Sequence, residues 1–108
     1  MAFGERAATQ LDWLAPRTAL PLRERIVATL RLGPQPHPYR RIRRGRDGRL
    51  TLAVQDWRVD FHVDGGRIDV LEVRSGYQPA QLQKSARDPQ DPLRVHRDYI
   101  ASFEGMTR

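Results

Sequence analysis

The fold is decided by residues 50–73, LTLAVQDWRVDFHVDGGRIDVLEV. Apolar and smaller or polar residues alternate over 50–54 and again over 59–63, which is the pattern of strands with one buried face. A Gln-Asp pair and an Asp-Gly-Gly triplet separate the runs and are typical of turns. The third run, 68–73, has apolar residues on both faces, as expected of a central strand. This stretch therefore predicts a three-stranded antiparallel meander.

Two short amphipathic helices are predicted before the meander. Residues 7–14 have apolar side chains at helical spacing. A second helix begins at Thr18 or Pro21 and has an apolar face formed by Leu22, Ile26, Val27 and Leu30. Phe3 is a candidate for a short additional strand. We expect an α+β fold in which an N-terminal αα-hairpin packs on a small antiparallel β-sheet.

The prolines of the chain suggest its domain organisation. Residues 33–38, GPQPHP, predict an extended connector between the helices and the sheet. A domain over 1–80 is then followed by a polar linker over 81–92 and a C-terminal helical tail over 93–108. The tail has Val95, Tyr99 and Phe103 at i, i+4 and i+8, so this helix can dock on its own domain, which is the commoner outcome, or on a partner.

Composition limits the protein class. A chain of 108 residues with 39% hydrophobic content supports one core. It lacks cysteine, which argues against disulfides and favours the cytoplasm, and it lacks the apolar run of a signal peptide or membrane span. Nineteen Lys and Arg against thirteen Asp and Glu leave a net charge of +6, and only Lys84 is lysine. A polyanionic partner is one explanation; an arginine-rich codon usage is the other.

The most basic run precedes the meander. It contains five arginines that are candidates for nucleic-acid binding: Arg40, Arg41, Arg43, Arg44 and Arg46. Arginine binds phosphate through two donors of its planar guanidinium, so contact with nucleic-acid phosphates is the functional interpretation. The alternative is a charged strand edge that prevents aggregation.

A second constellation lies on one strand. Alternation places Arg58, Asp60 and His62 on the same face, where His62 is a candidate proton donor or acceptor and Arg58 a candidate phosphate anchor. The alternative is a solvated strand face with an Arg–Asp pair. The three histidines lack zinc-ligand spacing, and neither a Ser-His-Asp nor a P-loop motif is found. We expect no metal and no cofactor.

These motifs together resemble the RelE/ParE superfamily of toxins from bacterial type II toxin-antitoxin systems. The resemblance covers about residues 3–80 and is carried by DWRV at 56–59 with Phe61, by DG at 64–65 and by VLEV at 70–73. It implies a RelE/ParE-like arrangement of the sheet. It also implies a toxin that blocks growth through metal-independent cleavage of messenger RNA. The alternative is a noncatalytic ParE-like inhibitor of DNA gyrase, or a degenerate nucleic-acid-binding relative.

The resemblance also implies site residues. Arg58 matches the family's strand arginine. Two basic positions of the preceding strand correspond here to Thr51 and Ala53, and a later arginine and tyrosine correspond to Gly76 and Ala80.

Arg74 and Tyr77 lie near those two positions and are candidate substitutes. The implied catalytic set is therefore Arg58, His62, Arg74 and Tyr77. Expected partners are a cognate acidic antitoxin and either RNA and the ribosome or DNA gyrase, with no membrane.

Overall fold

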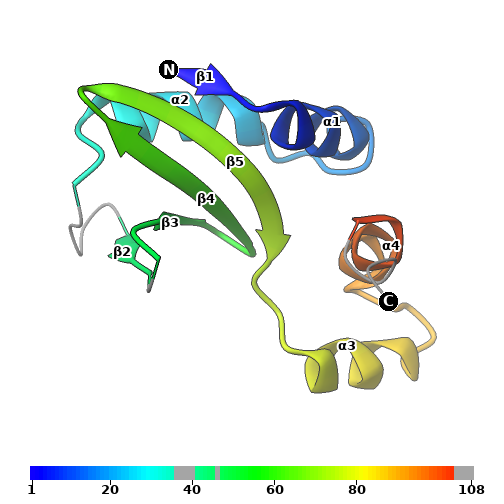
Figure 1. The fold of residues 1–108 in the computed structure, drawn as a ribbon. Coiled ribbons are helices and arrows are strands. Elements are labelled where there is room, and N and C mark those ends of the chain that lie inside the picture. Colours follow the sequence, from blue (N-terminus) through cyan, green and yellow to red (C-terminus); the bar gives the residue numbers. More distant parts are fainter. Residues whose placement is uncertain (36–40, 46, 104–108) are drawn as a thin grey trace.

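The structure, a computed structural model, describes residues 1–35, 41–45 and 47–103. These residues form five strands and four helices, so the predicted α+β class is confirmed (Figure 1). In chain order the elements are β1 (Ala2–Phe3), α1 (Glu5–Leu14), α2 (Leu22–Arg31), β2 (Ile42–Arg44), β3 (Leu50–Val54), β4 (Trp57–Asp64), β5 (Arg67–Ser75), α3 (Pro79–Ala86) and α4 (Arg94–Phe103).

The strands form one sheet in the order β1-β5-β4-β3-β2. The predicted meander of β3, β4 and β5 is confirmed, because Val54 pairs with Trp57 across one turn and Asp64 with Arg67 across the next. The expectation of a wholly antiparallel sheet is wrong, since β1 runs parallel to β5. The chain leaves β1 directly into α1, which packs along β5, and this path sets the direction of β1. The likeness of the arrangement to the toxin family stays a prediction.

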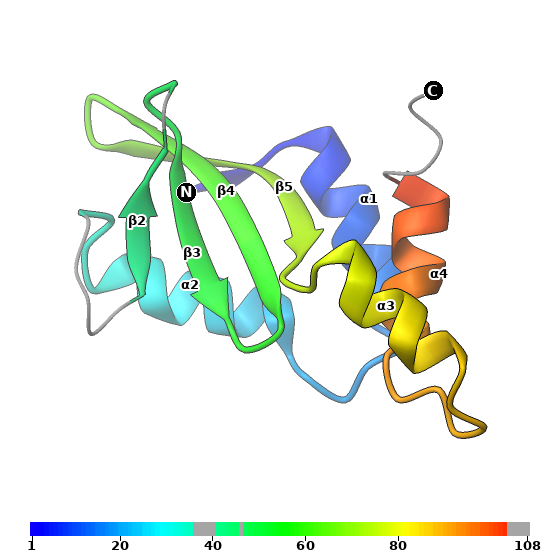
Figure 2. The same cartoon turned by 90° about the horizontal axis from the view of Figure 1, so that it is seen from below.

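Helices α1 and α2 cover one face of the sheet (Figure 1), as the αα-hairpin prediction requires. Their apolar sides meet the inward residues of the central strands, and the core includes Leu11, Leu14, Ile26, Leu30, Leu52, Val59, Phe61, Val70 and Val73. Figure 2 looks at the other face, where strands β2, β3 and β4 lie in front of α2. This uncovered face is available for a functional surface.

A bulge in β5 explains why its apolar residues do not alternate. Asp60 pairs with Glu72, whereas the next residue, Phe61, pairs with Val70, so Leu71 is the extra residue. Both Val70 and Val73, three positions apart, are consequently buried. The bulge also changes which residues of β5 lie opposite those of β4, and the contact of Arg74 with Asp60 depends on this register.

The C-terminal part differs from its prediction. Part of the expected polar linker over 81–92 is helical, since α3 extends through Ala86. Its start is stabilised by Pro79 in the first turn and by a capping box in which the side chains of Gln78 and Gln81 bond each other's backbone N–H. We missed these signals because the segment is polar.

Helix α4 packs on its own chain. Tyr99 is fully buried, and its ring meets Trp13 and Trp57 edge to face, with centroids 5.7 and 5.0 Å away. Its hydroxyl donates to the carbonyl oxygen of Val73 on β5. The predicted connector over 33–38 lies only partly within the described residues.

Candidate nucleic-acid interface

An open groove of about 1150 Å³ crosses the uncovered face of the sheet from β2 to the end of β5. Five arginines line it, namely Arg41, Arg43, Arg44, Arg58 and Arg74, and we call it the arginine groove. Three of them belong to the predicted nucleic-acid-binding set. Arg40 and Arg46 of that set lie outside the described residues. The arrangement gathers guanidinium groups from three strands around one concave surface, which suits a phosphate backbone.

The β2 arginines sit on the edge of the sheet. Arg43 pairs with Thr51 of β3, and Arg43 and Arg44 are both exposed. Their neighbour Ile42 is buried in the core and anchors the strand. Arg41 has a positive φ of 58°, where the chain turns into β2. This conformation costs a non-glycine residue free energy.

Arg74 is bound to a buried carboxylate. Its Nε and Nη2 lie 2.7 and 2.8 Å from the two carboxylate oxygens of Asp60, whose side chain is only 8% exposed. The hydroxyl of Thr51 donates to the same carboxylate at 2.8 Å. Three strands are thus joined by one polar chain, and the charge of Arg74 is largely compensated before any ligand arrives.

Arg58 is fixed at the other side of the groove. Its Nη1 donates to the carbonyl oxygens of Gln55 and Trp57, both at 2.9 Å. A Cβ atom on Gly76 would lie 3.0 Å from Cζ and Nη1 of Arg58 and 2.8 Å from the carbonyl oxygen of Asp56. The guanidinium therefore fills the space that a side chain at position 76 would need, which explains why Gly76 fits here.

Four side chains gather where the arginine groove meets α4, and we call them the Ser75 cluster: Asp56, Ser75, Tyr77 and His96. The Oγ of Ser75 lies 2.6 Å from Nδ1 of His96, and Nε2 of His96 lies 3.8 Å from Oδ2 of Asp56. The imidazole stacks on Trp57 at 4.0 Å and meets the Tyr77 ring edge to face at 4.8 Å. Only Ser75 and Tyr77 of the cluster line the groove.

Two pKa values in this cluster depart from their ordinary range. Burial lowers the pKa of His96, and the nearby Asp56 carboxylate opposes this in part. Desolvation, followed by the negative charge of Asp56 and a hydrogen bond to it, raises the pKa of Tyr77. At neutral pH both rings are therefore uncharged.

His96 and Ser75 were not predicted as site residues. His96 was expected in a tail, and no Ser-His-Asp motif is recognisable in the sequence because these residues come from three separate elements. One usable signal was present, since His96 and Tyr99 stand at i and i+3 on the same side of an amphipathic helix.

The structure brings together three of the four predicted catalytic residues, and His62 is the exception. Arg58, Arg74 and Tyr77 line the arginine groove. His62 is exposed on β4, pairs with Asp69 and is not among the residues that line the groove. The strand face that it was expected to share with Arg58 and Asp60 extends past the groove.

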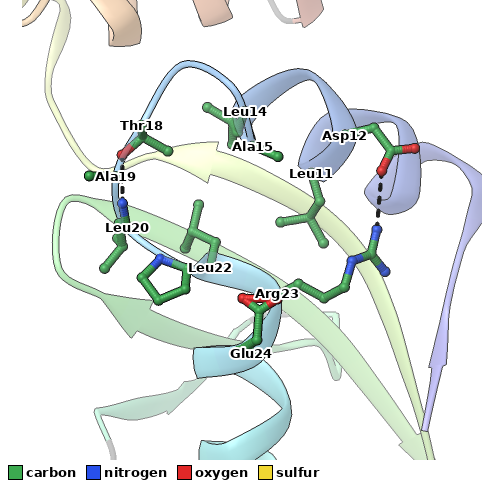
Figure 3. A pocket seen from close by; sticks show the side chains of 11 residues that line it. Leu11, Asp12, Leu14, Ala15, Thr18, Ala19, Leu20, Leu22, Arg23 and Glu24 are labelled. Atoms are coloured by element: carbon green, nitrogen blue, oxygen red, sulfur yellow. Dashed lines mark hydrogen bonds and ion pairs between the residues drawn. The ribbon is translucent and has the colours of Figure 1, made fainter.

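A smaller pocket of about 310 Å³ lies between α1 and α2 (Figure 3). Leu11, Leu14 and Leu22 are among its lining residues, and the ion pair of Arg23 with Asp12, at 3.5 Å, is exposed. The hydroxyl of Thr18 accepts a hydrogen bond from the Leu20 amide within the turn. The pocket lies where the turn between α1 and α2 packs against both helices, and its polar groups do not converge on one point.

Among residues 1–35, 41–45 and 47–103, no three His, Asp or Glu side chains are grouped as metal ligands would be. No helix in the same ranges is long and apolar enough to cross a membrane. No family model, curated protein or solved structure matches the chain. The arginine groove and its surroundings are therefore the features that indicate function.

Proposed function

We propose that this protein binds RNA in the arginine groove and acts as the toxin of a type II toxin-antitoxin module. The observation that carries the proposal is the convergence of Arg41, Arg43, Arg44, Arg58 and Arg74 on one open surface. A polyanion that enters releases counterions from its phosphates, which drives binding at low salt. The net charge of +6 favours the encounter with such a partner.

Single-stranded RNA suits the groove better than a duplex. Tyr77 lines the groove beside the arginines, and its uncharged ring offers a surface on which a base can stack. Stacking of this kind is tolerant of sequence, and phosphate contacts add affinity without adding selectivity. We therefore expect weak sequence preference.

Cleavage of the bound messenger RNA, without a metal, is the activity that the resemblance implies. Arg58 and Tyr77 both line the groove, which supports a role for them in contacting a bound phosphate. Arg74 is the weaker candidate, because Asp60 already compensates its charge. This ion pair favours a second candidate function, a noncatalytic module that binds nucleic acid or inhibits gyrase.

Binding is tested with fluorescent single-stranded RNA and the full chain. Arg43→Ala should weaken binding and lower the slope of log K against log salt by about 0.7, the loss of one phosphate contact. The matched control is Arg31→Ala at the end of α2, on the helix-covered side of the sheet. Equal losses for both variants would show that net charge alone drives the association.

Toxicity is tested by expression without a partner. Growth arrest with cut transcripts, relieved by Arg58→Ala, supports the ribonuclease. Arrest with intact transcripts and gyrase-linked DNA breaks selects the inhibitor. Normal growth at confirmed soluble expression contradicts the toxin role. An acidic antitoxin that competes with RNA for the groove is the expected partner, and a small acidic reading frame beside the gene would support it.

A further inference from the structure

The Ser75 hydroxyl stands at the end of β5, where the arginine groove meets α4. Its Oγ accepts a hydrogen bond from the backbone N–H of Tyr77 at 3.2 Å and lies 2.6 Å from Nδ1 of His96. Since the Tyr77 amide uses a lone pair of Oγ, the hydroxyl proton is free to point to Nδ1. The imidazole then carries its own proton on Nε2, the nitrogen that faces Asp56.

His96 is unusually buried for a histidine on a surface helix. It is 5% exposed. Its ring stacks on Trp57, with centroids 4.0 Å apart, and meets the Tyr77 ring edge to face, with centroids 4.8 Å apart. Its Nε2 lies 3.8 Å from the Asp56 carboxylate, which stabilises the imidazolium that forms when Nδ1 accepts a proton. Burial keeps the ring neutral at pH 7 by lowering its pKa, so the base is in the form that accepts a proton.

The order hydroxyl, imidazole, carboxylate is that of an activated nucleophile. We propose that Ser75 is a nucleophile with His96 as its base, and that it attacks phosphoryl groups held in the arginine groove. The choice of a phosphoryl electrophile rests on the proposed function, because the groove arginines select anions. The reactivity of the hydroxyl itself rests only on the cluster.

The bonds and charges of the step balance. The bond from Oγ to phosphorus forms, and the bond from phosphorus to its leaving group breaks with both electrons going to the leaving group. The hydroxyl proton passes to Nδ1 of His96. The guanidinium of Arg58 lies beside Gly76, the residue after Ser75, where it can stabilise negative charge on the phosphoryl oxygens.

The probe for this site is an alkyl fluorophosphonate, which phosphonylates activated serines and releases fluoride. The full chain is incubated with it, and adducts are located by peptide mass spectrometry. Ser102 on α4 serves as an internal control, because it is exposed and is not part of the groove lining. We expect Ser75 to be labelled roughly 100-fold faster than Ser102, the contribution of a general base.

Variants separate activation from simple exposure. His96→Gln should slow labelling of Ser75 by roughly 100-fold, and Ser75→Ala should abolish it. Asp56→Asn, in the exposed turn between β3 and β4, is the second test, since it leaves the stacked ring in place while removing the charge that stabilises imidazolium. It should lower the labelling rate by about tenfold.

RNA binding by each variant is measured in parallel. Unlabelled Ser75, or a labelling rate that neither Asp56→Asn nor His96→Gln reduces, would overturn the nucleophile whether or not RNA binds. Labelling of Ser75 in a chain that does not bind RNA would instead keep the nucleophile and reject the proposed function.

Discussion

Asp60 binds Arg74 through both carboxylate oxygens, at 2.7 and 2.8 Å, across the β4–β5 pair. The carboxylate is buried, whereas the arginine lines the arginine groove and is 39% exposed, so the pair is only partly screened by water. The pair links the stability of the fold to RNA binding, because the Arg74 guanidinium binds Asp60 and also lines the groove.

Asp60→Asn should lower stability and strengthen RNA binding. Loss of the charged hydrogen bonds costs about 2 kcal/mol in the free energy of unfolding. Arg74 then loses the negative charge of Asp60, and RNA affinity at low salt should rise roughly fivefold, about 1 kcal/mol. Chemical denaturation and RNA titration measure the two effects. Asp64→Asn, an equal charge change in the exposed β4–β5 turn, is the control; an equal affinity gain there would show that Arg74 is not involved.

Gly76→Ala should displace Arg58. The new Cβ would lie 2.8 Å from the Asp56 carbonyl oxygen, a backbone atom that cannot move without shifting the β3–β4 turn. We expect a loss of about 2 kcal/mol in stability, typical of overpacking, and weaker RNA binding. Gly45→Ala, whose Cβ would meet Arg49 O at the milder distance of 3.3 Å, is the comparison for stability. A fully stable Gly76→Ala would disprove the close packing at this position.

The meander was predictable because its signals are local. Alternating residues over 50–54 and the Asp-Gly-Gly turn each act within a few positions, and both appear in the structure where the sequence placed them. The parallel pairing of β1 was not predictable, since Ala2 meets Asp69 only after two helices have been placed. Helix α3 was missed because its capping box uses glutamines, which also occur in linkers.

The site was predictable only as a set of residue types. Arg41, Arg43 and Arg44 were selected from the basic run as candidates for nucleic-acid binding, and they line one groove because they are close in sequence. The pairing of Arg74 with Asp60 depends on strand register after a bulge, which no local pattern specifies. His96 acquires its neighbours through packing of α4, so its environment is a property of the whole fold.

Stability should fall as pH decreases through the titration of His96. The unfolded chain binds the proton with the ordinary pKa of 6.5, whereas burial lowers the pKa in the folded protein. The unfolded state therefore binds the proton more tightly, so the stabilisation is complete above pH 6.5 and is lost as pH falls through the lower folded pKa.

This pH dependence is measured as the thermal midpoint between pH 7.5 and 5. His96→Gln should flatten the curve over this range. Asp56→Asn removes the carboxylate that partly supports the charged ring, so the folded pKa falls further and the loss of stability continues to lower pH. A parent protein whose midpoint is constant from pH 7 to 5.5 would contradict the burial of a neutral imidazole.

Gln10 and Tyr99 complete the hydrogen bonds of β5 beyond the end of β1. The Val73 amide donates to Oε1 of Gln10 at 2.7 Å, and the Val73 carbonyl accepts from Tyr99, so helices α1 and α4 supply what a neighbouring strand would otherwise provide. Gln10→Ala leaves a buried amide without its acceptor and should cost about 2 kcal/mol.

Hydrogen exchange at the Val73 amide separates this cause from loss of packing. In Gln10→Ala the Val73 amide should exchange faster than the amides in the centre of β4, because only the former has lost its acceptor. Ala8→Gly on the same helix is the control: it lowers stability by about 1 kcal/mol through helix propensity and should speed exchange evenly in the sheet. If Val73 exchanges no faster than its neighbours in Gln10→Ala, the side chain is not the acceptor that protects the edge of β5.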